Sequence, residues 1–209
     1  MVNVKTIWNE KFKNNILNQQ FNLFLKKELN KFLKLIPRNS KILDLGCGNG
    51  EKTNHIANLG FNIIGIDSSK EAISYAKTKV PKLKFYLRNA LSTKLKNNSF
   101  DAIISIAVFH CFLEKDRKKY VKELNRILKN KGFLFQLVLS SEDETMKKGK
   151  EAEQNTFVQK SGIPFHLFTK EELEEYFSNF KCLTFEHHKK KAKNIQIAVY
   201  TMVLRKKIS

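Results

Sequence analysis

The sequence has 209 residues, of which 42% are hydrophobic and 17 are phenylalanine, so it can bury a core and is not a disordered chain. Its net charge of +19, carried mostly by lysine, makes a polyanionic partner such as RNA a hypothesis to consider. No apolar run approaches the roughly 18 residues of a membrane span, and the three cysteines form no Cys-x-x-Cys pair. We therefore expect no membrane partner and a reducing, cytoplasmic location.

The N-terminal part of the chain carries helix signals. Apolar residues recur at spacings of three and four between Leu17 and Ile36, which predicts a long amphipathic helix within 6–36. Pro37 is expected to end it, because proline pushes the preceding residue out of helical geometry. A shorter helix is expected around Trp8, the only tryptophan, which would pack in the core or cover a ligand.

Strand and helix patterns then alternate. Such alternation predicts a parallel sheet with helices on both faces. The expected strands cover 41–46, 62–67, 83–88, 101–106 and 133–139, and the expected helices cover 50–59, 69–79 and about 115–128.

The pattern changes beyond Ser140. The polar segment 141–161 has no clear strand period and is expected to be a mobile lid. Thr169 and Glu172 have the spacing of a capping box, which predicts a helix over 170–177. Two further strands, over 181–186 and 195–204, are expected to pair antiparallel at one edge of the sheet, with 187–193 as a basic turn.

The most informative segment is 42–50, which reads Ile-Leu-Asp-Leu-Gly-Cys-Gly-Asn-Gly. A strand that runs into alternate glycines and then a helix would let a ligand lie against bare backbone, beside the free N–H groups of the helix. Asp67 ends the next strand, where a carboxylate can accept hydrogen bonds from a ribose diol. These features predict a nucleoside-containing cofactor.

The charges around the glycines indicate which cofactor this is. The dinucleotide fingerprint needs a glycine where this chain has Glu51, and that carboxylate would repel a pyrophosphate. Asp44, before the first glycine, suits a positive centre such as an ammonium or a sulfonium. The segment resembles the first motif of class I S-adenosylmethionine (SAM) methyltransferases, whose ligand carries both groups. The stretches at 88–90, 100–105 and 128–132 resemble later motifs of the same family.

The resemblance implies a fold, a cofactor and the residues that bind it. The fold would be α/β: a Rossmann-like, seven-stranded, mostly parallel sheet with helices on both faces, an antiparallel C-terminal edge strand and an N-terminal helical extension. A single domain would cover 1–209, with helices in 1–37, the cofactor-binding core in 38–140 and the acceptor side in 141–209. SAM would be held by Asp44, Gly46, Cys47, Gly48, Asn49, Gly50, Asp67, Ser68, Asn89, Ala90 and Ile106.

Methyl transfer from a sulfonium needs alignment and exclusion of water, and a general base only if the acceptor must lose a proton. His110, just past the fourth strand, and His166, in the C-terminal part, are the candidate bases, although each is equally suited to packing. The pair His187 and His188 does not form a zinc spacing with Cys182, so no metal site is expected.

The acceptor is expected to be a small molecule, and the alternative is tRNA. The run 99–110, with Arg117 and Glu123, is similar to tRNA wobble-uridine methyltransferases, whereas 149–157 and 162–169 are similar to small prokaryotic methyltransferases, including the tellurite and thiol types. A pocket roofed by aromatic residues predicts a small acceptor, and a lysine-lined groove predicts RNA. The aromatic residues are Trp8, Phe165 and Phe168; the lysines are Lys26, Lys27, Lys189, Lys190 and Lys191.

The chain is expected to be a monomer or a homodimer. An NAD-dependent oxidoreductase conflicts with Glu51. A non-catalytic nucleic-acid-binding module leaves Asp44 and Asp67 without a role.

Overall fold

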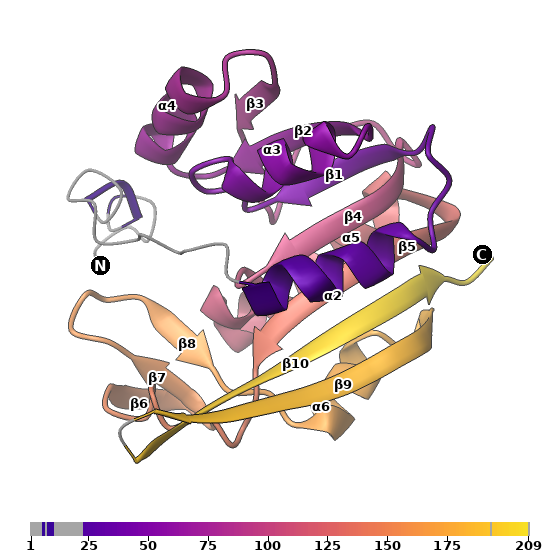
Figure 1. Ribbon diagram of the computed structural model, residues 1–209. Coiled ribbons are helices and arrows are strands. Elements are labelled where there is room, and N and C mark those ends of the chain that lie inside the picture. The colour runs from indigo at the N-terminus through magenta and orange to yellow at the C-terminus, as the bar shows by residue number, and fades with distance from the viewer. Residues whose placement is uncertain (1–5, 7, 11–22, 193, 209) are drawn as a thin grey trace.

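A twisted seven-stranded sheet forms the centre of the computed structural model, which describes residues 6, 8–10, 23–192 and 194–208 (Figure 1). The strand order is β3-β2-β1-β4-β5-β10-β9. The first five strands in this order are parallel, and β10 runs antiparallel to both β5 and β9. The sheet confirms the predicted fold. Its strands are β1 (Lys41–Leu45), β2 (Asn62–Asp67), β3 (Lys84–Leu87), β4 (Phe100–Ile106), β5 (Leu128–Leu139), β9 (Phe180–Ala192) and β10 (Ile195–Lys206).

Helices cover both faces of the sheet (Figure 1). Successive side chains of a strand point to opposite faces, so each strand contributes to two apolar layers. In β4, for example, Ile104 packs in the layer beneath α2, whereas Ile103 packs in the layer beneath α5 and α6. The helices are α2 (Leu23–Leu33), α3 (Glu51–Asn58), α4 (Lys70–Lys79), α5 (Glu114–Ile127) and α6 (Lys170–Tyr176), with a 3-10 turn, η1, at Phe109–Cys111. Every helix that the structure describes is too short or too polar to cross a lipid bilayer.

Side-chain caps start two of these helices, and the sequence predicts the second of them. The hydroxyl of Ser69 accepts a hydrogen bond from the N–H of Ala72 at the start of α4. At the start of α6, the Thr169 hydroxyl accepts from the N–H of Glu172, and the Glu172 carboxylate accepts from the N–H of Thr169. Both caps satisfy N–H groups that have no partner inside the helix, and the second is the predicted capping box.

The long N-terminal helix is only partly as predicted. Residues 11–22 lie outside the described part of the chain, so the predicted course of this segment stays a prediction there. Helix α2 ends at Leu33 and does not continue to Ile36. A turn follows the helix, in which the N–H of Leu35 donates to the carbonyl of Phe32 at 3.0 Å. This turn brings the side chain of Ile36 back into the core.

The expectation that 141–161 lacks strands was wrong, whereas its role as a mobile lid stays a prediction. This region contains β6 (Lys150–Glu153) and β7 (Thr156–Val158), which form an antiparallel sheet with β8 (Pro164–His166). Asn155 adopts a positive φ of 57° in the tight turn between β6 and β7, a conformation that asparagine tolerates better than most residues. These strands are too short and too polar to show a period of two in the sequence.

The expected basic turn at 187–193 was also wrong, because β9 continues through it to Ala192. The His187 ring lies 4.4 Å from the ring of Tyr200 on β10, and His188 Nε2 lies 2.8 Å from the Thr201 hydroxyl. The histidines are therefore cross-strand partners of β10. The chain reverses direction near Asn194, whose φ is 63°.

Candidate cofactor site

The glycine turn after β1 has a backbone that only glycine adopts without strain. Gly46, Gly48 and Gly50 have φ values of 77°, 54° and 78°, in the left-handed region. A Cβ atom on Gly46 would lie 2.2 Å from Cγ2 of Val108, in the loop after β4. The turn can therefore pass close to that loop only because this position has no side chain.

Several N–H groups of this turn, and that of Glu51 at the start of α3, bond within the protein, whereas the sequence led us to expect free ones. Gly46 and Cys47 both donate to the carbonyl of Ile66, at 2.8 and 2.9 Å. Gly48 donates to Asp67 Oδ2 at 3.0 Å, and Glu51 donates to Asn49 Oδ1 at 3.1 Å. These donors tie the turn to β2 and fix the Asp67 carboxylate. They do not form a cradle for a pyrophosphate, which agrees with the exclusion of a dinucleotide.

Asp67 is held in one orientation at the end of β2. Its Oδ2 accepts from Gly48 and its Oδ1 accepts from the N–H of Ser69 at 2.9 Å, so both oxygens keep lone pairs that can accept further bonds. Burial raises the pKa of Asp67, while the two N–H donors and the charge of Lys52 oppose this rise. The result is a fixed carboxylate that faces a cavity and can accept hydrogen bonds from a diol.

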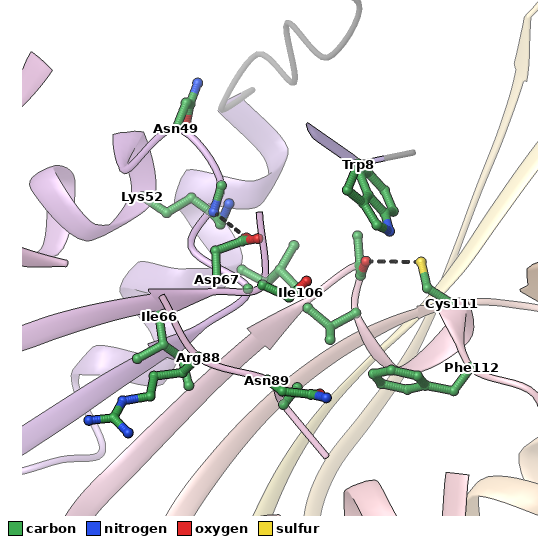
Figure 2. A pocket seen from close by; sticks show the side chains of 16 residues that line it. Trp8, Asn49, Lys52, Ile66, Asp67, Arg88, Asn89, Ile106, Cys111 and Phe112 are labelled. Atoms are coloured by element: carbon green, nitrogen blue, oxygen red, sulfur yellow. Dashed lines mark hydrogen bonds between the residues drawn. The ribbon is translucent and has the colours of Figure 1, made fainter. Parts of the chain in front are cut away.

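A cavity opens at the carboxyl ends of β1–β4, where ligands of open α/β sheets bind. Figure 2 shows Lys52 and Asn49 on one side of it and Trp8, Cys111 and Phe112 on the other. Ala107 adopts a φ of 60° on its wall, the kind of backbone strain that clusters at ligand sites. The cavity is lined by Trp8, Gly46, Gly48, Asn49, Lys52, Ile66, Asp67, Ser68, Arg88, Asn89, Ala90, Ile106, Ala107, Val108, Cys111 and Phe112.

Most of the predicted cofactor residues meet at this cavity: Gly46, Gly48, Asn49, Asp67, Ser68, Asn89, Ala90 and Ile106. Gly50 and Cys47 do not line it. Gly50 is the N-cap of α3, and Cys47 is buried against Phe85, Ile73 and Ala76. Burial raises the pKa of the Cys47 thiol well above its usual range, which disfavours the nucleophilic thiolate.

Asp44 lies beneath the turn and does not line the cavity. It is fully buried, and its Oδ2 accepts a hydrogen bond from the Thr53 hydroxyl at 2.6 Å. Its Oδ1 has no hydrogen-bond partner among the described residues. Because this oxygen is not accessible from the cavity, a direct contact between Asp44 and the ammonium group of SAM stays a prediction.

Asn89 has less freedom than the sequence suggested. Its side-chain carbonyl accepts from the N–H of Leu91 at 2.9 Å, which fixes the orientation of the amide. The oxygen keeps a second lone pair, so both it and the NH2 group remain able to bind a base.

Neither predicted general base lines the cavity. His110 is buried, and its Nδ1 accepts from the N–H of Leu139 at 3.1 Å. His166 lies between Thr156 and Glu172, with Nδ1 2.8 Å from the hydroxyl and Nε2 3.2 Å from the carboxylate. Burial is the main cause that lowers the pKa of each imidazole to about 3. A catalytic role for either residue stays a prediction.

Sequence reasoning missed Lys52, Ile66, Arg88, Cys111 and Phe112 as lining residues. A signal existed for Lys52, because it begins the buried face of α3 that continues with Thr53 and Ile56 at helical spacing. The predicted roof is partly right. Trp8 and Phe165 pack with Cys111 and Ile163, whereas Phe168 is buried and stacks on Phe109 at 4.7 Å.

One group of possible metal ligands lies away from the cavity. The ligand atoms of Glu28, Glu186 and His188 are within 4.8 Å of one another. The ammonium of Lys31 lies 2.9 Å from Glu28 and 3.5 Å from Glu186, so the two carboxylates already share a cation.

Comparisons with known proteins agree with this geometry. A family model described as a methyltransferase domain matches residues 43–136. An uncharacterized methyltransferase of Schizosaccharomyces pombe is 31% identical over 107 residues, which are 49% of this chain and 74% of that protein. The tRNA (carboxymethyluridine(34)-5-O)-methyltransferase alkbh8 of Xenopus tropicalis is 33% identical over 117 residues, which are 56% of this chain but only 18% of that protein.

A solved structure shares the fold. It is the Burkholderia thailandensis 1,6-didemethyltoxoflavin-N1-methyltransferase, with its substrate and S-adenosylhomocysteine bound. The TM-score is 0.75 at 14% identity, over 98% of this chain and 88% of that one. With the glycine turn, the fixed Asp67 and the unpaired Asp44 oxygen at one end of the sheet, these matches show that the chain belongs to the class I SAM-dependent methyltransferases.

Proposed function

We propose that this protein transfers a methyl group from SAM to a small, largely apolar acceptor. The observation that carries the proposal is the wall opposite Lys52, where Trp8, Cys111 and Phe112 line the cavity (Figure 2). Residues around β8 reach this wall, because Ile163 and Phe165 pack with Cys111 and Trp8. An apolar wall with aromatic rings suits a small, flat acceptor and also excludes water from the methyl group.

The lining residues indicate which kind of acceptor atom would react. Among the described residues that line the cavity, Asp67 is the one carboxylate and there is no histidine. The residues outside the described part contain no Asp, Glu or His that could serve as a base. We therefore expect an acceptor atom that is nucleophilic at neutral pH without a protein base, such as a thiolate or an aromatic amine.

A matched panel of acceptors tests this proposal. Thiophenol, aniline and phenol have the same ring and differ in the attacking atom, so the release of S-adenosylhomocysteine from SAM reports the effect of that atom alone. We expect methylation of the thiol or the amine, and little of the phenol. Turnover of phenol at the same rate, or turnover with tRNA alone, would contradict the proposal.

The alternative acceptor is tRNA, and the placement of the lysines favours it. Phe24 of α2 lies against His188 of β9, with ring centroids 4.6 Å apart, so Lys27 on α2 and Lys189–Lys191 on β9 belong to neighbouring, exposed segments. The salt dependence of binding tests this surface. A tRNA enzyme should prefer tRNA to heparin and lose affinity steeply as salt rises, whereas a shallow, equal response for both would remove the hypothesis.

Two further expectations stay predictions from the sequence. A cytoplasmic location is supported by the odd number of cysteines, three, which form no Cys-x-x-Cys pair in the sequence. The monomer or homodimer state can be measured by light scattering of the purified chain, and a larger assembly would contradict it.

A further inference from the structure

Three side chains with metal-binding atoms meet where α2 lies against β9, away from the cofactor cavity. Glu28 belongs to α2, whereas Glu186 and His188 are two residues apart on β9 and therefore point to the same face of the sheet. The ligand atoms of the three residues all lie within 4.8 Å of one another, and His188 Nε2 is 3.6 Å from Glu186 Oε2. Ligands about 2.1 Å from a tetrahedral ion lie about 3.4 Å apart, so a small rotation of the side chains would close this group around one ion.

The fold already places a cation at these carboxylates. The ammonium of Lys31 lies 2.9 Å from Glu28 and 3.5 Å from Glu186, and its hydrogen bond to Glu28 raises the pKa of Lys31. Glu28 exposes only 6% of its surface, so its charge needs a counter-ion at this position. The lysine is replaceable, because half of its side chain is exposed and an exposed ammonium contributes little to such a pair. Its ammonium returns to water when another cation takes its place.

The types of ligand indicate which cation fits. An imidazole nitrogen together with carboxylate oxygens is a donor set of Zn²⁺, whereas Ca²⁺ and Mg²⁺ prefer oxygen ligands alone. The His188 ring is held in one plane, because the Thr201 hydroxyl lies 2.8 Å from Nε2 and the Phe24 ring packs edge-on at 4.6 Å. No metal site was expected from the sequence, because Glu28 reaches the two residues of β9 only through the packing of α2.

We propose that Glu28, Glu186 and His188 form a Zn²⁺ site that fastens α2 to the edge strand β9, and that Lys31 is the cation that competes for this site. Three protein ligands leave the fourth position of the ion to water. The site is separate from methyl transfer, because none of the three ligands lines the cofactor cavity. Its consequence is stability, since an ion that binds only the folded chain raises the free energy of unfolding.

Calorimetric titration of the untagged, metal-free chain with zinc chloride tests the proposal, and Co²⁺ serves as a spectroscopic probe. We expect one Zn²⁺ per chain, a higher unfolding temperature in excess Zn²⁺ and the visible absorption bands of tetrahedral cobalt. His188→Gln and Glu186→Gln should each weaken Zn²⁺ binding at least about tenfold. Lys31→Met should tighten it several-fold, because the competing ammonium is gone. Mg²⁺ should not replace Zn²⁺ at the same concentration.

Two variants are matched controls. His187→Gln removes the neighbouring imidazole, which faces the other side of β9, and should leave Zn²⁺ binding unchanged. Cys182→Ser tests the exposed thiol as an alternative ligand and should also bind as wild type does.

The proposal is overturned if the wild type binds no Zn²⁺, if His187→Gln and His188→Gln weaken binding equally, or if Lys31→Met leaves the affinity unchanged. Loss of binding in Cys182→Ser would assign the ion to the thiol and would overturn it as well. Circular dichroism of each metal-free variant verifies its fold, and Glu186→Gln carries the same test if His188→Gln does not fold.

Discussion

Gly46 shows how one residue controls the approach of two loops. Its φ is 77°, and an added Cβ would lie 2.2 Å from Val108 Cγ2. We predict that Gly46→Ala lowers the free energy of unfolding by about 2–4 kcal/mol, since a left-handed alanine costs about 1 kcal/mol and overpacking costs about 1–3 kcal/mol.

Urea denaturation measures this effect, and Gly60→Ala is the control. Gly60 has a φ of 87°, but nothing lies within 4 Å of its added Cβ, so only the backbone strain is introduced. Equal losses in the two variants would show that the contact with Val108 is unimportant.

Trp8 offers a direct signal, because it is the only tryptophan and lines the cavity. We predict that S-adenosylhomocysteine changes the intensity or wavelength of the tryptophan emission as it fills the cavity. The Trp8→Phe variant should lose this signal but still bind the ligand by calorimetry. An unchanged emission of the wild type at saturation would place Trp8 away from the ligand.

At the scale of elements, α5 anchors the loop that follows β3. Glu123 Oε1 accepts from the N–H of Thr93 at 2.7 Å and from its hydroxyl at 2.5 Å, and Arg126 lies 2.7 Å from the same oxygen. These contacts fix the loop a few residues after Asn89, so α5 helps to position the base-binding end of the cavity.

Glu123→Gln tests this anchor through its pH dependence. The hydrogen bond with Arg126 is the main cause that lowers the pKa of Glu123 from 4.5 to about 2. Because the folded pKa is depressed, the stabilisation is fully present above pH ~4.5 and is lost as the pH falls toward ~2. We predict that the variant is about 2 kcal/mol less stable at pH 7 and that this difference shrinks at acid pH.

Denaturation at several pH values measures this difference. Asp116→Asn on the same helix is the control. Its carboxylate pairs with the exposed Lys119 at 2.9 Å, so its loss should cost less than about 1 kcal/mol. A stability difference for Glu123→Gln that stays constant between pH 7 and acid pH would rule out the proposed ionic anchor.

The elements that the sequence predicted well are those with long periodic patterns. The β–α alternation through β5 and the capping box of α6 were visible because each depends on neighbours in the sequence. The small sheet β6–β8 was missed because its strands are only three or four residues long and depend on pairing with one another. The extent of β9 was missed because its lysines and histidines are stabilised by pairing with β10.

At the scale of the whole molecule, the sheet brings distant segments to one cavity. The residues at the ends of β1–β4 were predictable, because parallel strands place their carboxyl ends at one edge. The apolar wall was harder to predict, since Trp8 packs there with Cys111 of η1 and Phe165 of β8, which are far from it in the sequence. The two histidines looked catalytic in the sequence, but the fold uses the lone pair of His110 to accept a backbone N–H.

The central claim is that this cavity holds SAM with its ribose on Asp67, and calorimetry with S-adenosylhomocysteine tests it most directly. We predict that Asp67→Ala binds at least about tenfold more weakly than wild type, because a charged hydrogen-bond acceptor contributes ~1.5–3 kcal/mol. Asp101→Ala is the control, since this carboxylate bonds to Lys129 and to the N–H of Lys41 at the opposite end of β4. Equal affinity of wild type and Asp67→Ala would contradict the account.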